Sequence, residues 1–218
     1  MKNKAEQHYD KAYFEWQQRI GIFGGKANLF KFEKYIKPDD TVLDFGCGGG
    51  YLLDSISCKK KYGIDINDSA RAEAGRKGII CQATIDPIPP ESIDVIISNS
   101  CLGHCTDPYG ILVSLKRILK KTGKIVFVVP CENSLKVKKD DVNKICYTWT
   151  PQNLANLFTV AGYEVTEAEC IKSKWPPMYE MIQKLVGWKM FHIICKLYCR
   201  IRRTGYQTRV AAVLPEKE

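Results

Sequence analysis

The sequence predicts an α/β fold built on a mainly parallel sheet. Short runs of β-branched and aromatic residues alternate with segments of helical periodicity, which is typical of strands joined by crossover helices. The chain has 218 residues, of which 45% are hydrophobic and 26% charged, the balance of a folded globular protein rather than a disordered one. A chain of this length can bury a core without disulfide bonds, and it contains no internal repeat.

Five strand-like runs occupy the first part of the chain, and helical segments separate them. We expect strands at 41–45, 62–66, 79–83, 93–98 and 124–129, and helices at 51–56, 69–77 and 111–121. Asn67-Asp68-Ser69 supplies a start signal for the second helix, and Gly78 supplies its stop signal. Basic residues close the third helix, where they complement the helix dipole.

The second half continues the alternation. Thr150 and Pro151 have the residue types of a helix N-cap and a first helical position, so we expect a helix from there to Gly162. Two further strands are expected at 164–172 and 207–214.

The segment before the first strand, residues 5–36, has helical character and is rich in aromatic residues. Aromatic side chains at helical spacing most often pack a helix onto the sheet. We expect this packing for Phe30, Phe32 and Tyr35.

Ten cysteines include no Cys-x-x-Cys pair, which argues against a zinc site. Cys81, Cys101, Cys146 and Cys195 stand in apolar runs, so we expect reduced core cysteines. The polar N-terminus lacks the apolar stretch of a secretory signal, and no run approaches the length of a membrane span. We therefore expect a cytoplasmic protein, either free there or lying on a membrane from that side.

The segment most informative about function is 42–50, VLDFGCGGG, in which a buried strand leads into a glycine-rich turn that opens a helix. Glycines let the backbone approach a ligand closely, and free N–H groups at a helix start favour an anionic group. About twenty residues further on, Asp65 ends the second strand, where a carboxylate can accept hydrogen bonds from ribose hydroxyls. Together these features predict a ligand that contains adenosine.

The spacing of the glycines narrows the class of ligand. They fall at 46, 48 and 50, and Tyr51 occupies the place of the third glycine in the dinucleotide fingerprint G-x-G-x-x-G. The P-loop pattern is absent as well. An acidic residue followed by G-x-G-x-G resembles the first motif of class I S-adenosylmethionine-dependent methyltransferases.

This resemblance extends from about residue 9 to residue 214. It implies a Rossmann-like, seven-stranded, mainly parallel sheet with helices on both faces, and a last strand that is antiparallel. It also implies S-adenosyl-L-methionine as the cofactor. We expect a single methyltransferase domain, 1–218, divided into a helical cap at 1–36, a cofactor-binding core at 37–172, a basic helical insertion at 173–206 and the last strand at 207–214.

The resemblance further implies a set of cofactor-binding residues. Asp44 matches the acid beneath the methionine end of the cofactor, and Asp65 matches the ribose-binding acid. Ile66 is similar to the adenine-packing residue, and the segment 83–85 occupies the place where the family contacts the adenine edge. The expected cofactor-binding residues are Asp44, Gly46, Cys47, Gly48, Asp65, Ile66, Thr84, Ile85 and Asn99. No metal ligand is expected.

His104 is the main candidate for a catalytic base, because a histidine suits proton transfer near neutral pH. Leu102-Gly103-His104 resembles a common Leu-Glu-His ending of the fourth-strand motif, with Gly103 in place of the acid. The alternative is that His104 only caps or orients the following helix. Glu132 is a second candidate base, or else a surface acid. Tyr9 and Tyr13 are candidates for closing over the methionine end.

The acceptor is less constrained than the cofactor. The fourth-strand exit, 98–101, reads SNSC and lacks the Asn/Asp-Pro-Pro-aromatic tetrad of enzymes that methylate base or glutamine nitrogens. Segments 147–154 and 161–165 resemble bacterial small-molecule and glycan-biosynthesis methyltransferases, so we favour O-methylation of a small molecule or glycan precursor. The alternatives are a lipid or quinone methyltransferase at a membrane surface, or a non-catalytic cofactor-binding protein. The net charge of +9 alone does not indicate a nucleic-acid substrate.

The basic insertion predicts an amphipathic helix between Pro176-Pro177 and Thr204-Gly205. From residue 178 to 203 there are six basic residues and one acid, Glu180. A basic stripe is expected at Lys189, His192, Lys196, Arg200 and Arg203, and an apolar face at Met190, Ile194, Leu197, Tyr198 and Ile201. Residues 178–203 thus form either a surface that contacts a membrane or an anionic, lipid-linked substrate, or a helix that packs on this domain or a second subunit, with solvated charges.

Overall fold

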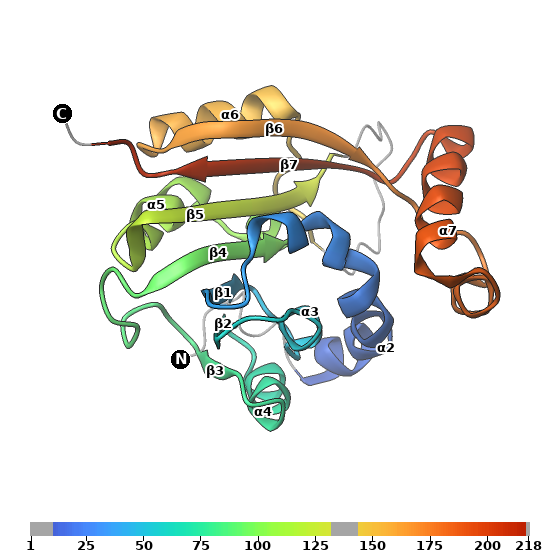
Figure 1. Ribbon diagram of the computed structural model, residues 1–218, viewed down its shortest axis with the longest axis horizontal. Coiled ribbons are helices and arrows are strands. Elements are labelled where there is room, and N and C mark those ends of the chain that lie inside the picture. The colour runs from blue at the N-terminus through green and yellow to red at the C-terminus, as the bar shows by residue number, and fades with distance from the viewer. Residues whose placement is uncertain (1–10, 132–143, 217–218) are drawn as a thin grey trace.

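The structure is a computed structural model, which describes residues 11–131 and 144–216. Within these residues one seven-stranded sheet has the strand order β3-β2-β1-β4-β5-β7-β6 (Figure 1). The strands are β1 Thr41–Phe45, β2 Lys60–Ile64, β3 Ile80–Gln82, β4 Ile93–Asn99, β5 Leu119–Pro130, β6 Glu164–Lys172 and β7 Tyr206–Val213. The α-helices are α2 Lys11–Asn28, α3 Tyr51–Asp54, α4 Asp68–Arg76, α5 Pro108–Leu115, α6 Pro151–Val160 and α7 Tyr179–Arg202. Short 3-10 turns form η1 Leu29–Lys31, η2 Glu33–Tyr35 and η3 Leu102–His104.

The first five strands are parallel, and β7 runs antiparallel between β5 and β6. This confirms the predicted seven-stranded, mainly parallel sheet. The strand order reverses between β1 and β4, the neighbouring strands that carry Asp44 beside Ile97. In open α/β sheets the crevice at such a reversal, at the carboxyl ends of the strands, is the usual place for a ligand. The fold therefore points to the end of β1 as the site.

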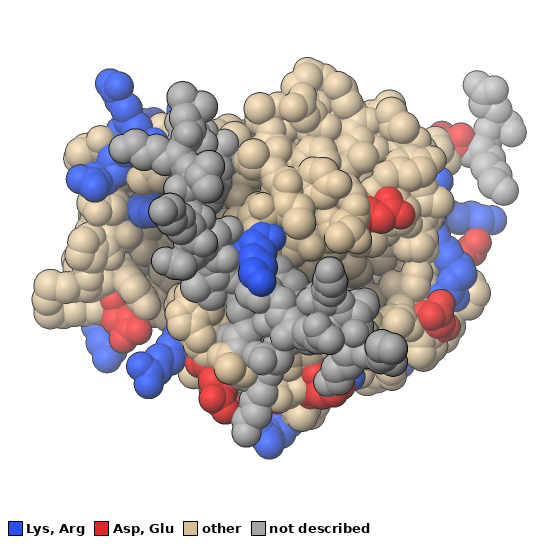
Figure 2. Space-filling model, turned by 180° about the vertical axis from the view of Figure 1, so that it is seen from behind, with Lys and Arg blue, Asp and Glu red and all other residues tan. Residues whose placement is uncertain are grey.

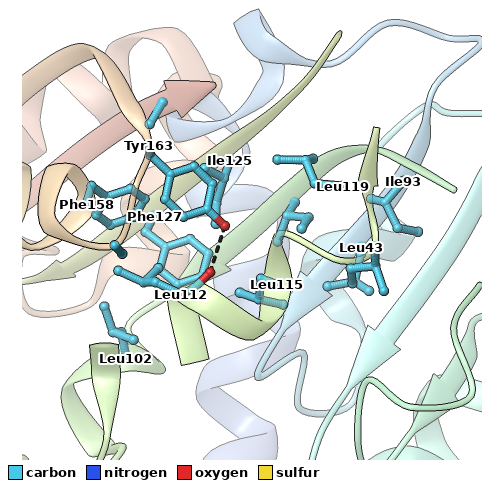
Figure 3. Packing of buried hydrophobic residues seen from close by; sticks show 14 of the residues in the cluster. Leu43, Ile93, Leu102, Leu112, Leu115, Leu119, Ile125, Phe127, Phe158 and Tyr163 are labelled. Atoms are coloured by element: carbon cyan, nitrogen blue, oxygen red, sulfur yellow. Dashed lines mark hydrogen bonds between the residues drawn. The ribbon is translucent and has the colours of Figure 1, made fainter. Parts of the chain in front are cut away.

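Two buried clusters, one on each face of the sheet, form the core. Alternating residues of β5 divide between them: Phe127 enters the first cluster and Val126 the second, as the two-residue period of a strand requires. The first cluster lies beneath α5 and α6, where the Phe127 and Phe158 rings are 5.7 Å apart (Figure 3). The Tyr163 hydroxyl donates to the Leu112 carbonyl oxygen at 2.9 Å (Figure 3), so this buried phenol is satisfied.

The expected packing of the N-terminal aromatics is confirmed. Phe32 is fully buried in the second cluster, and Phe30 and Tyr35 pack against it. The N-cap is confirmed as well, because the Thr150 hydroxyl accepts the Asn153 N–H at 3.2 Å.

The predicted helix at 111–121 was misplaced. α5 begins at Pro108 and ends at Leu115, and residue 119 already belongs to β5. Asp107 is the N-cap, and its side chain accepts the Gly110 N–H at 2.8 Å. Leu119, which the prediction placed near the end of this helix, instead belongs to β5, because it is fully buried there and pairs with Ile93 of β4.

Smaller differences concern the second strand and the cysteines. β2 ends at Ile64 rather than at residue 66, so Asp65 lies just beyond the strand. All ten cysteines are free, but Cys146 is exposed rather than in the core. Cys146 stands in an apolar stretch of the sequence, but residues 144–150 lie at the surface without regular secondary structure.

The basic insertion is helical, as predicted, but its faces differ from the expected ones. Phe191, Cys195 and Cys199 are the buried residues of α7. The His192 ring packs 4.6 Å from the Phe30 ring, so His192 does not belong to the exposed basic stripe. Residues 194 and 198 are partly buried and do not share the exposed apolar face with Leu197. The helix turns its aromatic and cysteine residues, rather than its aliphatic ones, toward the domain.

Gly50, the N-cap of α3, provides a test of the local fold. Its φ is 74°, and a Cβ there would lie 2.4 Å from the Ile79 Cδ1 atom. We expect Gly50→Ala to lower the free energy of unfolding by about 1–3 kcal/mol, because it adds both backbone strain and overpacking. The measurement is urea denaturation.

Gly75→Ala is the matched control. Gly75 lies inside α4, and a Cβ there would meet no atom within 4 Å. Alanine should raise the free energy of unfolding by roughly 0.5–1 kcal/mol, because it removes the conformational entropy cost of glycine in a helix. Equal effects of the two substitutions would contradict this account of the turn.

Candidate active site

The glycine-rich turn after β1 is held by backbone contacts with the end of β2. The N–H groups of Gly46 and Cys47 both donate to the Ile64 carbonyl oxygen, at 2.8 and 3.0 Å. Gly46 has a φ of 77°, and a Cβ on it would lie 2.3 Å from the Cys101 Sγ atom. Glycine is therefore required at residue 46 for both the conformation and the close approach of the η3 segment.

Asp65 joins this turn to the segment after β2. One carboxylate oxygen accepts the Gly48 N–H at 2.8 Å, and the other accepts the Asn67 N–H at 2.9 Å. Burial raises the pKa of Asp65, and these two N–H donors oppose the rise. Each oxygen keeps a further lone pair, so the carboxylate can accept additional hydrogen bonds from a ligand.

Asp44, the fourth residue of β1, is a buried acid whose Oδ1 atom has no hydrogen-bond partner among the described residues. Burial, and then the nearby Asp65 charge, raise the pKa of Asp44 to about 8. The carboxyl group is therefore largely protonated at neutral pH in the free protein. A buried polar atom without a partner costs stability, and such an atom in a crevice indicates a binding function.

A cavity of about 160 Å³ lies beside these residues. Its walls come from α2, the glycine-rich turn, Asn99 at the end of β4, and Trp175. Asp44, Gly46, Cys47, Gly48 and Asn99 all line it. The structure thus brings together five of the residues that the sequence predicts.

The close approach of α2 to this cavity depends on a glycine face that sequence reasoning missed. A Cβ on Gly25 would lie 2.3 Å from the Tyr51 carbonyl oxygen, and a Cβ on Gly21 would lie 2.9 Å from the Tyr51 ring. The Gln18 side chain donates to the Tyr51 hydroxyl at 3.0 Å. Glycines at 21, 24 and 25 inside a helical segment were the available signal, because that spacing places them on one face.

Lys31 is a second residue that the sequence analysis did not identify. It is buried in η1, and its Nζ atom donates to Asn99 Oδ1 at 3.2 Å. Burial, and then the Arg209 charge, lower the pKa of Lys31 to about 7. A lysine between two phenylalanines was the available signal, since lysine is rarely fully buried without a functional or structural reason.

The remaining predicted cofactor residues lie at the ends of β2 and β3, outside the cavity. The Ile66 side chain is 44% exposed, directly after Asp65. The exposed Thr84 hydroxyl donates to Asp86 at 2.9 Å, and Ile85 packs against the first core cluster. Because β2 and β3 are adjacent and parallel, Ile66 and the segment 84–85 follow neighbouring strand ends at one edge of the sheet.

His104 is partly buried in η3, where its N–H donates to the Cys101 carbonyl oxygen at 2.9 Å. It is not among the described residues that line the cavity. Gly103 before it has no room for a larger side chain, because a Cβ there would lie 2.9 Å from the Tyr147 carbonyl oxygen. Tyr9, Glu132 and the Tyr13 side chain lie outside the described residues.

The chain is similar to known proteins in both sequence and fold. Residues 16–168 match the model of a protein family described as a methyltransferase domain, which is more than half of the chain. The chain belongs to this family. Residues 16–168 are thus a methyltransferase domain of the class I, S-adenosylmethionine-dependent type.

Individual relatives match only part of this chain. The ubiquinone biosynthesis O-methyltransferase of Nitrosomonas europaea is 30% identical over 101 residues, which cover 41% of this chain and 43% of that protein. The methyltransferase chain thus spans less than half of that relative's length.

Solved structures share the fold at low sequence identity. A complex of the Haloferax volcanii Trm112 methyltransferase activator with a methyltransferase matches with a TM-score of 0.70 and 18% identity, over 99% of both chains. Geranyl diphosphate C-methyltransferase from Streptomyces coelicolor, in complex with Mg²⁺, geranyl diphosphate and S-adenosyl-L-homocysteine, matches with a TM-score of 0.60 and 13% identity, over 87% of this chain and 77% of that one. These similarities show the fold of the methyltransferase.

The residues of the crevice fit S-adenosylmethionine in chemical terms. The cofactor carries a sulfonium cation and ribose hydroxyls, and the crevice offers the unpartnered Asp44 oxygen and the Asp65 carboxylate. A Cβ on Gly48 would point toward Gln17 across the cavity, 3.8 Å from its Oε1 atom. The turn therefore leaves backbone exposed on the side where a ligand fits.

The buried Asp44 carboxyl group predicts a pH-dependent stability. With a folded pKa raised from 3.8 to about 8, the folded protein keeps a proton that the unfolded chain has lost. The contribution to stability is thus full below the unfolded pKa and is lost as the pH rises toward 8. Relative to Asp44→Asn, the free energy of unfolding of the wild type should fall with pH, by at most about 1.4 kcal/mol per pH unit.

Urea denaturation at several pH values between about 5 and 7 measures this difference. Asp54→Asn is the control, because Asp54 is an exposed acid of α3. Parallel curves for the wild type and Asp44→Asn would show that Asp44 titrates normally and would contradict the assigned protonation state.

Proposed function

We propose that the protein transfers a methyl group from S-adenosylmethionine to an oxygen atom of a small molecule or glycan precursor. The proposal rests on two acids that lie at the glycine-rich turn. Asp65 accepts a hydrogen bond from the Gly48 N–H, and the buried Asp44 has a carboxyl oxygen without a partner among the described residues. The cofactor, when bound, supplies a methyl group on a positively charged sulfur, which is an electrophile with a good leaving group. The protein's part is then mainly to position the acceptor.

The proposed roles of the cofactor residues follow from their places. Asp65 would accept hydrogen bonds from the ribose hydroxyls while it also accepts the hydrogen bond from the Gly48 N–H. Asp44 provides a countercharge at the methionine end, and the backbone of Gly46, Cys47 and Gly48 lines that end. Ile66, Thr84 and Ile85, at the ends of β2 and β3, would hold the adenine. Asn99, which lines the cavity from the end of β4, would contact the bound cofactor.

An oxygen acceptor is supported by two observations. A ubiquinone biosynthesis O-methyltransferase is 30% identical to 41% of this chain, and the exit of β4 lacks the motif of base and glutamine N-methylation. A hydroxyl acceptor must lose a proton. We propose His104 as the proton acceptor and Lys31, whose pKa is lowered to about 7, as a second candidate.

A lipid or quinone acceptor at a membrane surface is the second candidate function. The specific observation in its favour is the exposed apolar face of α7, which includes Met190, Leu197 and Ile201.

Binding of S-adenosyl-L-homocysteine tests the cofactor site. We expect Asp65→Ala to weaken binding by roughly 1.5–3 kcal/mol, which is about a tenfold to hundredfold rise in Kd, because charge-assisted hydrogen bonds to the ribose are lost. Isothermal titration calorimetry gives the affinity, and Asp54→Ala, which removes an exposed acid, is the control. Equal affinity of Asp65→Ala and wild type would refute the assignment of Asp65.

Methyl transfer from labelled S-adenosylmethionine to hydroxyl and amine acceptors tests the reaction class. Label should appear on oxygen, and nitrogen products alone would contradict O-methylation. His104→Ala should lower turnover at least about a hundredfold with unchanged cofactor affinity, because proton transfer by a positioned base contributes on that order. If Lys31→Met lowers turnover instead, the proton acceptor is Lys31.

A further inference from the structure

α7 carries an exposed apolar face that does not pack on the domain. The helix bends at Gly187, whose φ is 72° and ψ is 172°. In the part after the bend, four aliphatic residues spaced by three or four positions form one line along the helix. We name them the apolar stripe: Met190 is 48% exposed, Ile193 45%, Leu197 51% and Ile201 78%.

A different face of α7 holds the helix on the protein. The Phe23 ring of α2 lies 5.4 Å from the Trp188 ring and 5.6 Å from the Phe191 ring. Cys195 and Cys199 are buried on the same side. Because this aromatic contact already attaches α7 to the domain, the apolar stripe is not needed for packing within the described residues.

Positive charges run beside the apolar stripe. Lys189, Lys196 and Arg200, which we name the cationic row, are exposed and lie at positions that share one side of the helix. None of the three forms a salt bridge with another described residue. Figure 2, which reverses the view of Figure 1, shows lysine and arginine side chains projecting along the left edge, where α7 lies.

These charges distinguish between the two partners that an apolar face can take. An antiparallel twofold contact with a second copy of the chain would bring two cationic rows to the same side of the contact, and like charges would oppose it. A bilayer with anionic headgroups is complementary to both features, because its boundary accepts apolar side chains and its surface attracts lysine and arginine. Among the described residues, no helix has the length and apolar character of a membrane span.

We propose that α7 docks on an anionic phospholipid bilayer, with the apolar stripe in the headgroup–acyl boundary and the cationic row on the headgroups. The proposal rests on the second candidate function, methylation of a lipid or quinone, because it assigns the site an acceptor that resides in the membrane.

The position of α7 connects this surface to the cavity. Figure 1 shows α7 at the end of the molecule toward which the arrowheads of β4 and β5 point, which is the edge that carries the site. Phe23 of α2 also contacts Trp175, with ring centroids 5.1 Å apart, and Trp175 lines the cavity together with α2. A membrane on the apolar stripe would therefore lie next to the elements that enclose the cavity.

Vesicle co-sedimentation tests the proposal. The probes are vesicles of phosphatidylcholine alone and of equal parts of phosphatidylcholine and phosphatidylglycerol. Wild-type protein should bind the anionic vesicles, and the binding should weaken as salt screens the charges. Leu197→Asp/Ile201→Asp should lower partitioning at least about tenfold through lost apolar insertion. Lys189→Glu/Lys196→Glu/Arg200→Glu should lower it at least about a hundredfold, at roughly fivefold for each cation.

Two control variants place comparable changes elsewhere on the surface, and the second of them introduces a single acid. Lys37→Glu/Lys59→Glu/Lys121→Glu changes the net charge equally, but these exposed lysines lie near the amino ends of β1, β2 and β5. Val160→Asp replaces an aliphatic residue of α6 that is 71% exposed. Both control variants should bind anionic vesicles within about twofold of the wild type, because the field of a charge at a membrane decays within a Debye length.

Two results would overturn the proposal. One is a wild-type protein that binds neither vesicle at low salt, or whose binding falls equally in the lysine control. The other is a dimer that dissociates in Leu197→Asp/Ile201→Asp, seen by analytical ultracentrifugation without vesicle binding, which would make the stripe a self-association surface. Calorimetry with S-adenosyl-L-homocysteine separates the membrane contact from the proposed reaction. A protein that binds the cofactor product but no vesicles would contradict only the membrane contact. A protein that binds vesicles but not the cofactor product would contradict only the proposed reaction.

Discussion

The hydrogen bonds from the backbone to the Asp65 carboxylate are the constraint on which the site depends. Through Gly48 and Asn67 they tie the glycine-rich turn after β1 to the segment after β2. The parallel pairing of β1 with β2 brings these two segments to the same edge of the sheet. The same acid keeps lone pairs free on the side of the crevice, so one side chain both shapes the turn and presents an acceptor.

Charge in the crevice is set by burial more than by pairing. Asp44 and Lys31 are both buried, and burial shifts the pKa of each toward neutrality, upward for Asp44 and downward for Lys31. Neutral forms are cheaper to bury than charged ones. A cationic ligand near Asp44 would favour its ionised form, so the free protein holds a latent negative charge at the place where the cofactor carries a positive one.

Local signals were sufficient for the alternation of strands and helices and for the cofactor turn, whereas the antiparallel last strand was implied only by the family resemblance. Glycine spacing, Asp65 and the helix caps act over a few residues, and the parallel alternation of strands needs no knowledge of distant contacts. The limits of α5 were missed because Leu119 is required by a long-range pairing with Ile93. Lys31 and the glycine face of α2 became visible only in three dimensions, since their partners Asn99 and Tyr51 are far away in sequence. For α7, periodicity located the helix but could not tell which of two apolar faces the aromatic residues of α2 would cover.

Proton release on cofactor binding tests the central claim most directly. S-adenosylmethionine is titrated calorimetrically near neutral pH in two buffers of different ionisation enthalpy. The account predicts release of close to one proton, because Asp44 has a pKa of about 8 in the free protein and ionises beside a bound cation. Asp44→Asn should bind with no release. Binding of the wild type with no net proton exchange, or equal release from Asp44→Asn, would contradict the role given to the unpartnered acid.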